Sequence, residues 1–242
     1  MHARAAATAA GLLLLVAACG GDDEALPQGS DSVELDPAEF VAGIDNPYWP
    51  MAPGTEWVYR ETDADGSEQR VEVAVTDRTK KILGIDAVVV RDVVSEDGEL
   101  REDTYDWYAQ DEDGNVWYLG EETKEYENGE VVSTEGSWEA GVDGAQAGIV
   151  MPADPKVGLA YRQEFYAGEA EDRGEILRLD ARAEVPFGSF GELLLTEETT
   201  PLEPDVVEHK FYAKGVGPVL AVAVSGGGGR EELVRFDRAP AG

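Results

Sequence analysis

The chain has little of the side chains that most enzyme sites use. Its 242 residues include one cysteine and two histidines, and His2 lies among the first residues. A multi-histidine zinc site is therefore excluded, and a Ser-His-Asp or Cys-His site would have to use His209. His209 alternates with Val207 and Phe211, which is typical of one face of a strand. We therefore expect no catalytic residues and a protein that is not an enzyme; a hydrolase with paired carboxylates is the weakest alternative.

Basic side chains are also scarce. There are 19 Lys and Arg residues against 51 Asp and Glu residues, which gives a formal net charge of −32 at pH 7. This charge disfavours nucleic acid as a partner, because phosphates bind lysine and arginine, and it repels anionic lipid headgroups. The acids alternate with valines and aromatics and collect at turns. We therefore expect them to form the solvated face of a folded domain.

The N-terminus reads as a secretory signal. A single positive charge, Arg4, precedes an apolar run from Ala5 to Ala18 that is too short for a comfortable transmembrane helix. Val16-Ala17-Ala18-Cys19 resembles the bacterial lipobox, and Cys19 is the only cysteine in the chain. The resemblance implies a signal peptide over residues 1–18, acylation of Cys19 with fatty acids such as palmitate, and an anchor in the cell membrane facing outside the cytoplasm. A free cysteine after an ordinary signal is the alternative.

Composition divides the remaining chain into two parts. Residues 19–36 are polar, acidic and rich in small side chains, which predicts a flexible acidic tether. From residue 37 to residue 242 we expect a single β-rich domain. Val71, Val73 and Val75 alternate with polar residues as in a half-buried strand. Acidic glycine turns at residues 63–66, 95–98, 111–114 and 127–129 predict antiparallel hairpins.

A constant offset of 104 residues indicates an internal duplication. It aligns Gly84 with Gly188, and Trp107-Tyr108-Ala109 with Phe211-Tyr212-Ala213. The halves would run over residues 47–119 and 152–237. We therefore predict an all-β fold, an antiparallel hairpin meander that forms two related sheets or one distorted barrel. A chance alignment is the alternative.

One turn has the composition of a calcium loop. Oxygen ligands at Asp111, Asp113, Asn115 and Glu122 follow the spacing of an EF-hand. Position six of that loop holds Val116 instead of glycine, and the flanks look like strands. An Asp-Gly hairpin turn is therefore the stronger interpretation, and Ca²⁺ is the only cofactor to consider.

The aromatic residues suggest either a ligand site or a core. Exposed aromatics could stack on a sugar, and enclosed ones could line an apolar cavity that holds a lipid. We expect Trp57 and Trp107 to lie in the core, and we keep Trp49 and Trp138 as candidate ligand contacts. The proline-rich segment from Asn46 to Trp57 predicts a rigid plug or lid at one end of the sheet.

Two segments carry a wider resemblance. Asn46 to Tyr59 and Asp103 to Leu119 are similar to uncharacterised bacterial secreted proteins and lipoproteins, a class without an assigned activity. We therefore expect a monomeric, non-catalytic envelope lipoprotein that binds a small molecule, apolar or lipid by analogy of architecture, or an envelope protein. A surface module that binds carbohydrate or calcium is the alternative.

Overall fold

A computed structural model describes residues 26–239 of the chain. The predicted signal peptide, Cys19 and the first part of the predicted tether lie outside the described residues. Within residues 26–239, no helix is long and apolar enough to span a bilayer.

Strands make up most of the described chain, with one short 3-10 turn, η1 (Pro37–Glu39). Ten longer strands form the wall: β2 (Glu56–Asp63), β3 (Glu68–Ile82), β4 (Ile85–Glu96), β5 (Glu99–Asp111), β6 (Val116–Glu127), β12 (Arg173–Val185), β13 (Gly188–Thr199), β14 (Val207–Ala213), β15 (Gly217–Ser225) and β16 (Gly229–Asp237). Six short strands complete the described set: β1 (Phe40–Val41), β7 (Glu130–Ser133), β8 (Trp138–Glu139), β9 (Gln146–Met151), β10 (Ala160–Arg162) and β11 (Glu164–Phe165).

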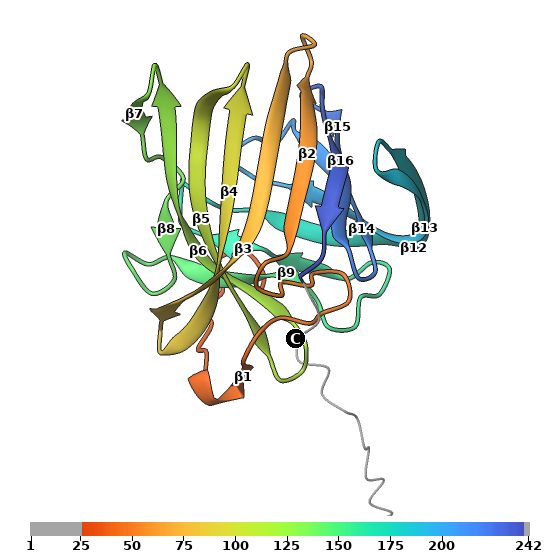
Figure 1. The fold of residues 1–242 in the computed structure, drawn as a ribbon. Helices are drawn as coiled ribbons and strands as arrows, with labels where there is room; N and C mark the ends of the chain where they lie inside the picture. Colours follow the sequence, from red (N-terminus) through yellow and green to blue (C-terminus); the bar gives the residue numbers. More distant parts are fainter. Residues whose placement is uncertain (1–25, 240–242) are drawn as a thin grey trace, which may run out of the picture.

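The strands form one antiparallel sheet that curls into a nearly closed barrel (Figure 1). Its order is β10-β12-β13-β14-β15-β16-β2-β3-β4-β5-β6-β9-β11, and β1, β7 and β8 pair with β5 or β6. The two ends of this order, β10 and β11, are joined in sequence by Gln163 but are not hydrogen-bonded to each other, which leaves a seam. The predicted all-β antiparallel fold is confirmed, in its distorted-barrel form.

The hairpin positions follow the sequence closely. All four predicted acidic glycine turns connect strands, namely β2 to β3, β4 to β5, β5 to β6 and β6 to β7. Asp97 and Gly98 show why such pairs are needed, because their φ angles of 52° and 83° fall where few other residue types are stable.

Both predicted halves contribute to the same barrel. Adding 104 to the bounds of β3 and β4 gives the bounds of β12 and β13 to within one residue. The same offset carries Asp106 and Tyr108 on β5 to Lys210 and Tyr212 on β14. The offset therefore relates strands that hold equivalent places in the two halves. The pairs Asp106 with Lys210 and Tyr108 with Tyr212 face the lumen described below.

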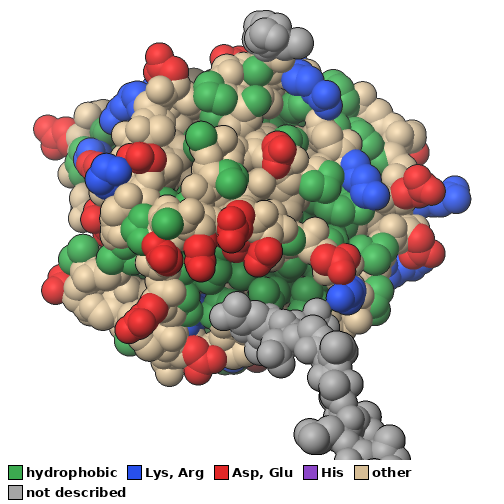
Figure 2. Space-filling model, turned by 90° about the horizontal axis from the view of Figure 1, so that it is seen from below, with side chains coloured by type: hydrophobic (Ala, Val, Ile, Leu, Met, Phe, Trp, Pro, Cys, Tyr) green, Lys and Arg blue, Asp and Glu red, His purple; other side chains and the backbone are tan. Residues whose placement is uncertain are grey.

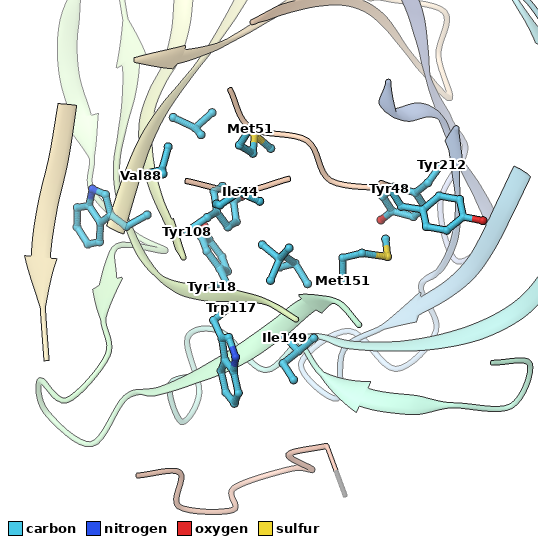
Figure 3. Close-up of a cluster of buried hydrophobic side chains, with 14 of the residues drawn as sticks. Ile44, Tyr48, Met51, Val88, Tyr108, Trp117, Tyr118, Ile149, Met151 and Tyr212 are labelled. Carbon is cyan, nitrogen blue, oxygen red and sulfur yellow. The ribbon is translucent and has the colours of Figure 1, made fainter. Parts of the chain in front are cut away.

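Residues 44–55 close the lower end of the barrel. Nδ2 of the Asn46 side chain donates to the Gly114 carbonyl in the β5–β6 turn, 2.9 Å away, and the backbone amide of Gly215 donates to the Pro47 carbonyl, 2.7 Å away. Ile44, Tyr48 and Met51 are buried in the core (Figure 3). The predicted plug at one end of the sheet is confirmed.

A buried arginine and the N-terminal segment fill the seam. Arg162 donates to the carbonyl oxygens of Ala147, Gly29 and Asp31 at 2.6, 2.9 and 2.6 Å, and its own amide donates to the Pro27 carbonyl. A Cβ on Gly148 would collide with the backbone of residues 162–163. Residues 26–36 are the described part of the predicted tether. Several of them contact the barrel and cover the seam.

Acidic side chains occupy much of the surface, as the composition predicts. Figure 2, a view from below, shows them spread among hydrophobic side chains on the lower face. Several are held in surface ion pairs, such as Arg91 with Asp103 at 2.7 Å. Another set of acids, however, points into the barrel.

Candidate functional site

The lumen of the barrel contains a cavity of about 280 Å³. Strands β2 to β5 form one side of it, β14 to β16 form the other, and residues 49–51 form its floor. Residues paired directly across neighbouring strands share a face, and Trp57, Val73 and Asp92 form one such row. The lining comprises five aromatic residues (Trp49, Trp57, Tyr59, Tyr108, Tyr212), four charged residues (Asp92, Asp106, Lys210, Glu231) and six aliphatic residues (Met51, Val73, Val90, Pro218, Leu220, Ala221).

The floor of the cavity is aromatic. The Trp49 ring packs against Tyr108 and Tyr212, with centroids 5.6 and 5.8 Å apart. Tyr108 stacks on Tyr118 at 4.8 Å, and Figure 3 shows this pair on the side of the lumen opposite Tyr212. The indole Nε1 of Trp49 is shielded from solvent and has no hydrogen-bond partner within residues 26–239. The floor therefore offers ring faces and one unsatisfied donor.

Three carboxyl groups stand above this floor. Asp106 accepts a hydrogen bond from the Tyr118 hydroxyl at 2.7 Å, and burial raises the pKa of Asp106 to about 6. Burial, and then the charge of Asp106, raise the pKa of Asp92 well above its usual range. Burial also raises the pKa of Glu231 to about 7. The Oδ1 atom of Asp92 is solvent-inaccessible and has no hydrogen-bond partner in the described chain.

The one lysine of the lining is already neutralised. Lys210 Nζ lies 2.8 Å from Glu198 and 3.2 Å from Glu208. Burial disfavours the Lys210 ammonium, but these two carboxylates outweigh it and raise its pKa. Burial likewise opposes the Glu198 carboxylate, yet Lys210 and hydrogen bonds from Tyr212 and Thr196 lower its pKa. In contrast, Asp92, Asp106 and Glu231 make no ion pair with any described residue.

More acids with raised pKa values lie around the lumen. Glu121 pairs across the sheet with Asp106, and burial raises its pKa to about 8. Glu164 accepts from the indole Nε1 of Trp138 at 3.0 Å, and burial raises its pKa well above the usual range. Near the β2–β3 hairpin at the top of Figure 1, burial raises the pKa of Glu61, and the neighbouring carboxylates Asp63, Glu208 and Glu102 raise it further.

Side chains toward the upper hairpin tips are more exposed than those near the floor of the lumen. Glu61, Glu102 and Glu208, which stand toward the upper hairpin tips, are partly exposed, whereas Trp57 and Tyr212 near the floor are buried. A ligand entering by this end would pass between acidic side chains.

The two predicted ligand contacts occupy different places. Trp49 lines the cavity floor. Trp138 is buried outside the cavity, where it packs edge-on against Tyr118 at 5.3 Å. Trp57 is buried as expected but its ring also lines the cavity, and Trp107 is buried on the other side of the sheet beneath Lys80, whose Nζ lies 3.1 Å from the ring centroid.

The structure does not bring the four predicted calcium ligands together. Asp111 accepts hydrogen bonds from Asn115 N and Nδ2 at 2.8 and 2.9 Å and from Trp117 Nε1 at 2.8 Å, as in a hairpin turn. Glu122 pairs with Tyr105, six residues from Asp111 along β5, a separation of roughly 20 Å at the usual rise of a strand. Asp113 stays in the turn. Within residues 26–239, no group of three or more His, Cys, Asp or Glu side chains is arranged to hold a metal ion.

The sequence interpretation missed the charged lining of the lumen. Asp92, Asp106, Lys210 and Glu231 were not predicted as site residues. One signal was present: Asp106 shares a strand face with Tyr108, and the 104-residue offset relates this pair to Lys210 and Tyr212. His209, on the opposite face of β14 from Lys210, lies 3.5 Å from Glu197.

Comparisons with known proteins give little further guidance. No family model matches the chain, and no curated protein matches it. Among solved structures, a "putative lipoprotein" from Parabacteroides distasonis ATCC 8503 is similar to 78% of this chain and 98% of its own, with a TM-score of 0.43 and 11% sequence identity. At that identity the match identifies no residue of the cavity.

Proposed function

We propose that this protein is a membrane-anchored, non-catalytic lipoprotein of the cell envelope whose barrel lumen binds a small ligand. The anchor is Cys19 of the lipobox, which would hold the barrel outside the cytoplasm. The contacts of residues 26–36 with the seam leave only the few residues between Cys19 and Leu26 to connect anchor and barrel. The folded domain would then sit close to the membrane surface.

The unsatisfied polar atoms of the cavity carry the binding proposal. Trp49 Nε1 is a buried donor and Asp92 Oδ1 is a buried acceptor, and both belong to residues of the cavity lining. Leaving such a group unpaired costs about 1–3 kcal/mol. A ligand that reaches these two shielded atoms would need both a donor and an acceptor, whereas a purely apolar ligand would leave both unpaired. This observation favours a polar or charged ligand over the lipid considered from the sequence.

The size of the cavity sets the size of the ligand. Small-molecule pockets commonly span roughly 300–1,000 Å³, and this cavity, at about 280 Å³, lies just below that range. A metabolite of a few carbon atoms fits such a volume, and a long acyl chain does not. Aromatic rings from both halves of the chain supply the apolar contacts.

A cavity-filling variant tests the proposal. Val73→Phe replaces an aliphatic side chain of the cavity lining with an aromatic ring that would fill part of the lumen. Val234→Phe makes the same change at a position that is 40% exposed. A ligand found by screening metabolites against the full-length protein for a rise in melting temperature should lose at least about 10-fold in affinity in V73F and keep its affinity in V234F. Near-ultraviolet circular dichroism would first establish that both variants fold. Equal binding by V73F, or no ligand in the screen, would reject the proposal.

The anchor has its own test. Cells given an alkyne-tagged palmitate should label the wild-type protein, and Cys19→Ser should abolish the label because the chain contains no other thiol. A label that persists in C19S would show that the lipobox interpretation is wrong.

A further inference from the structure

We infer that the ligand of the lumen is a small organic cation, an ammonium compound with an apolar body, held over the aromatic floor and between Asp92, Asp106 and Glu231. This inference rests on the proposed binding function and goes beyond it by naming the chemical class of the ligand.

The first argument is the charge imbalance of the cavity wall. Three carboxyl groups face the lumen, and the single lysine of the lining is held by Glu198 and Glu208. Burial raises the pKa of Glu231, and the charge of Lys210 lowers it. The Lys210 ammonium is nevertheless paired with Glu198 and Glu208 and forms no ion pair with any of the three acids. A positively charged ligand would supply a countercharge to these acids as they ionise, and the ionised acids would repel an anion.

The second argument is the unpartnered oxygen of Asp92. Asp92 Oδ1 is buried, belongs to the cavity lining and accepts no hydrogen bond from the described residues. An ammonium group has hydrogen-bond donors and a positive charge, both of which a carboxylate accepts. The neighbouring Asp106 stands opposite Val90 on the adjacent strand, two residues from Asp92, so the two carboxyl groups occupy one part of the wall.

The third argument is the aromatic floor. A cation over the face of a tryptophan or tyrosine is attracted by the negative face of the ring. Trp49, Tyr108 and Tyr212 gather at the base of the lumen, with Trp49 between the other two. Rings beside carboxyl groups suit an organic cation, since the rings contact its body while the acids take its charge.

A bare metal ion fits this site less well. Within residues 26–239, no three acidic or histidine side chains are arranged as metal ligands. The walls between the carboxyl groups are aromatic and aliphatic, and these groups cannot replace the oxygen ligands that Ca²⁺ or Mg²⁺ requires. The partly exposed acids at the upper end are Glu61, Glu102 and Glu208. Their charge would attract an organic cation as well as it would attract a metal ion.

A matched pair of probes tests the charge class. Phenethylamine and 2-phenylethanol have the same carbon skeleton and differ in the ammonium group. Isothermal titration of the full-length protein at pH 8 should give an affinity for phenethylamine at least about 10-fold higher than for 2-phenylethanol. Spermidine and choline extend the test to other ammonium compounds, and phenylacetate is the anionic counterpart.

Variants locate the binding. Asp106→Asn and Asp92→Asn keep the shape of each side chain and remove its charge, so each should weaken phenethylamine by at least about 10-fold. Asp103→Asn is the control, because Asp103 lies on the same strand as Asp106 but pairs with Arg91 on the outer face. Should D92N fail to fold, D106N alone decides.

The outcomes separate this inference from the proposed function. If 2-phenylethanol or phenylacetate binds as tightly as phenethylamine, if D106N binds it unchanged, or if the only ligands found in the screen are neutral or anionic, the lumen remains a binding site and the charge class is wrong. If no compound of any charge binds, the proposed function itself fails. Tight binding of an ammonium probe that depends on Asp106 and not on Asp103 supports both.

Discussion

The buried carboxyl of Asp106 should make the barrel less stable at pH 8 than at pH 5. Burial raises its pKa from 3.8 to about 6. The folded state therefore holds a proton on this group more tightly than the unfolded chain does. The stabilisation that comes from the protonated Asp106 carboxyl is complete below about pH 4 and is lost as the pH rises through about 6. Many proteins behave in the opposite way, since their paired carboxylates are stabilised when ionised.

The size of the effect follows from the pKa shifts. One pKa unit corresponds to about 1.4 kcal/mol, so the full effect of Asp106 is about 3 kcal/mol. Glu231 and Glu121, with pKa values of about 7 and 8, act in the same direction. Glu198 has a lowered pKa, so it stabilises the folded state when it is ionised. Its effect on stability changes only at pH values below the usual pKa of a glutamate and does not enter between pH 5 and pH 8. Because the unfolded carboxyl of Asp106 already ionises near pH 4, only about 1.4 kcal/mol of its effect falls between pH 5 and pH 8. Glu231 and Glu121 add to it, so the free energy of unfolding should fall by about 3 kcal/mol or more over this range.

Asp106→Asn isolates the part that belongs to one residue. The amide is neutral at every pH, so the variant should be within about 1 kcal/mol of wild type at pH 5, where the wild-type carboxyl is largely protonated. At pH 8 it should be more stable by about 1–2 kcal/mol, which allows for a weaker hydrogen bond from Tyr118. Urea unfolding of the full-length protein, followed by tryptophan fluorescence at half-unit steps of pH, measures both curves.

The control and the refuting results are equally specific. Asp103→Asn removes a surface ion pair with Arg91, which should lower stability by less than about 1 kcal/mol and leave the wild-type pH dependence in place. A wild-type protein that gains stability from pH 5 to pH 8 would contradict the reasoning. So would a D106N variant with the same slope as wild type.

Three further predictions concern the seam and the ligand. Gly148→Ala should destabilise the fold by about 2 kcal/mol or more, because its Cβ would collide with the backbone at Gln163, while Gly191→Ala meets no atom within 4 Å and should leave the melting temperature nearly unchanged. Arg162→Met should remove the bonds to three carbonyl groups, and faster hydrogen exchange in residues 26–33 would show it; unchanged exchange would mean that the arginine does not hold this segment. Binding of an ammonium probe should tighten from pH 5 to pH 8 with release of protons, because the carboxyl groups must ionise to bind it, and titration in two buffers of different ionisation enthalpy would detect that release.

Local patterns in the sequence predicted the strands and turns well, because each depends on neighbours in the chain. The glycine turns and the alternation of Val71, Val73 and Val75 are of this kind. The closure of the barrel is different, since it depends on β16 pairing with β2 across more than 160 residues. Alternation along β5 places Asp106 and Tyr108 on one face of the strand. It could not show whether that face meets solvent or a lumen, so the acids of the lumen were assigned to the surface.

The two halves of the barrel explain why the lumen is charged unevenly. The offset of 104 residues relates Tyr108 to Tyr212, and both rings meet Trp49, so the aromatic floor is shared between the halves. The same offset relates Asp106 to Lys210, where the halves differ in charge. An ion pair between these two residues would leave Asp92 and Glu231 as the unpaired acids of the lining. Instead Lys210 is held by Glu198 and Glu208 within its own half, which leaves Asp106 for another cation. The acid excess of the chain therefore has two locations, a solvated surface and a lumen in which Asp92, Asp106 and Glu231 form no ion pair with any described residue, and the second encloses a cavity.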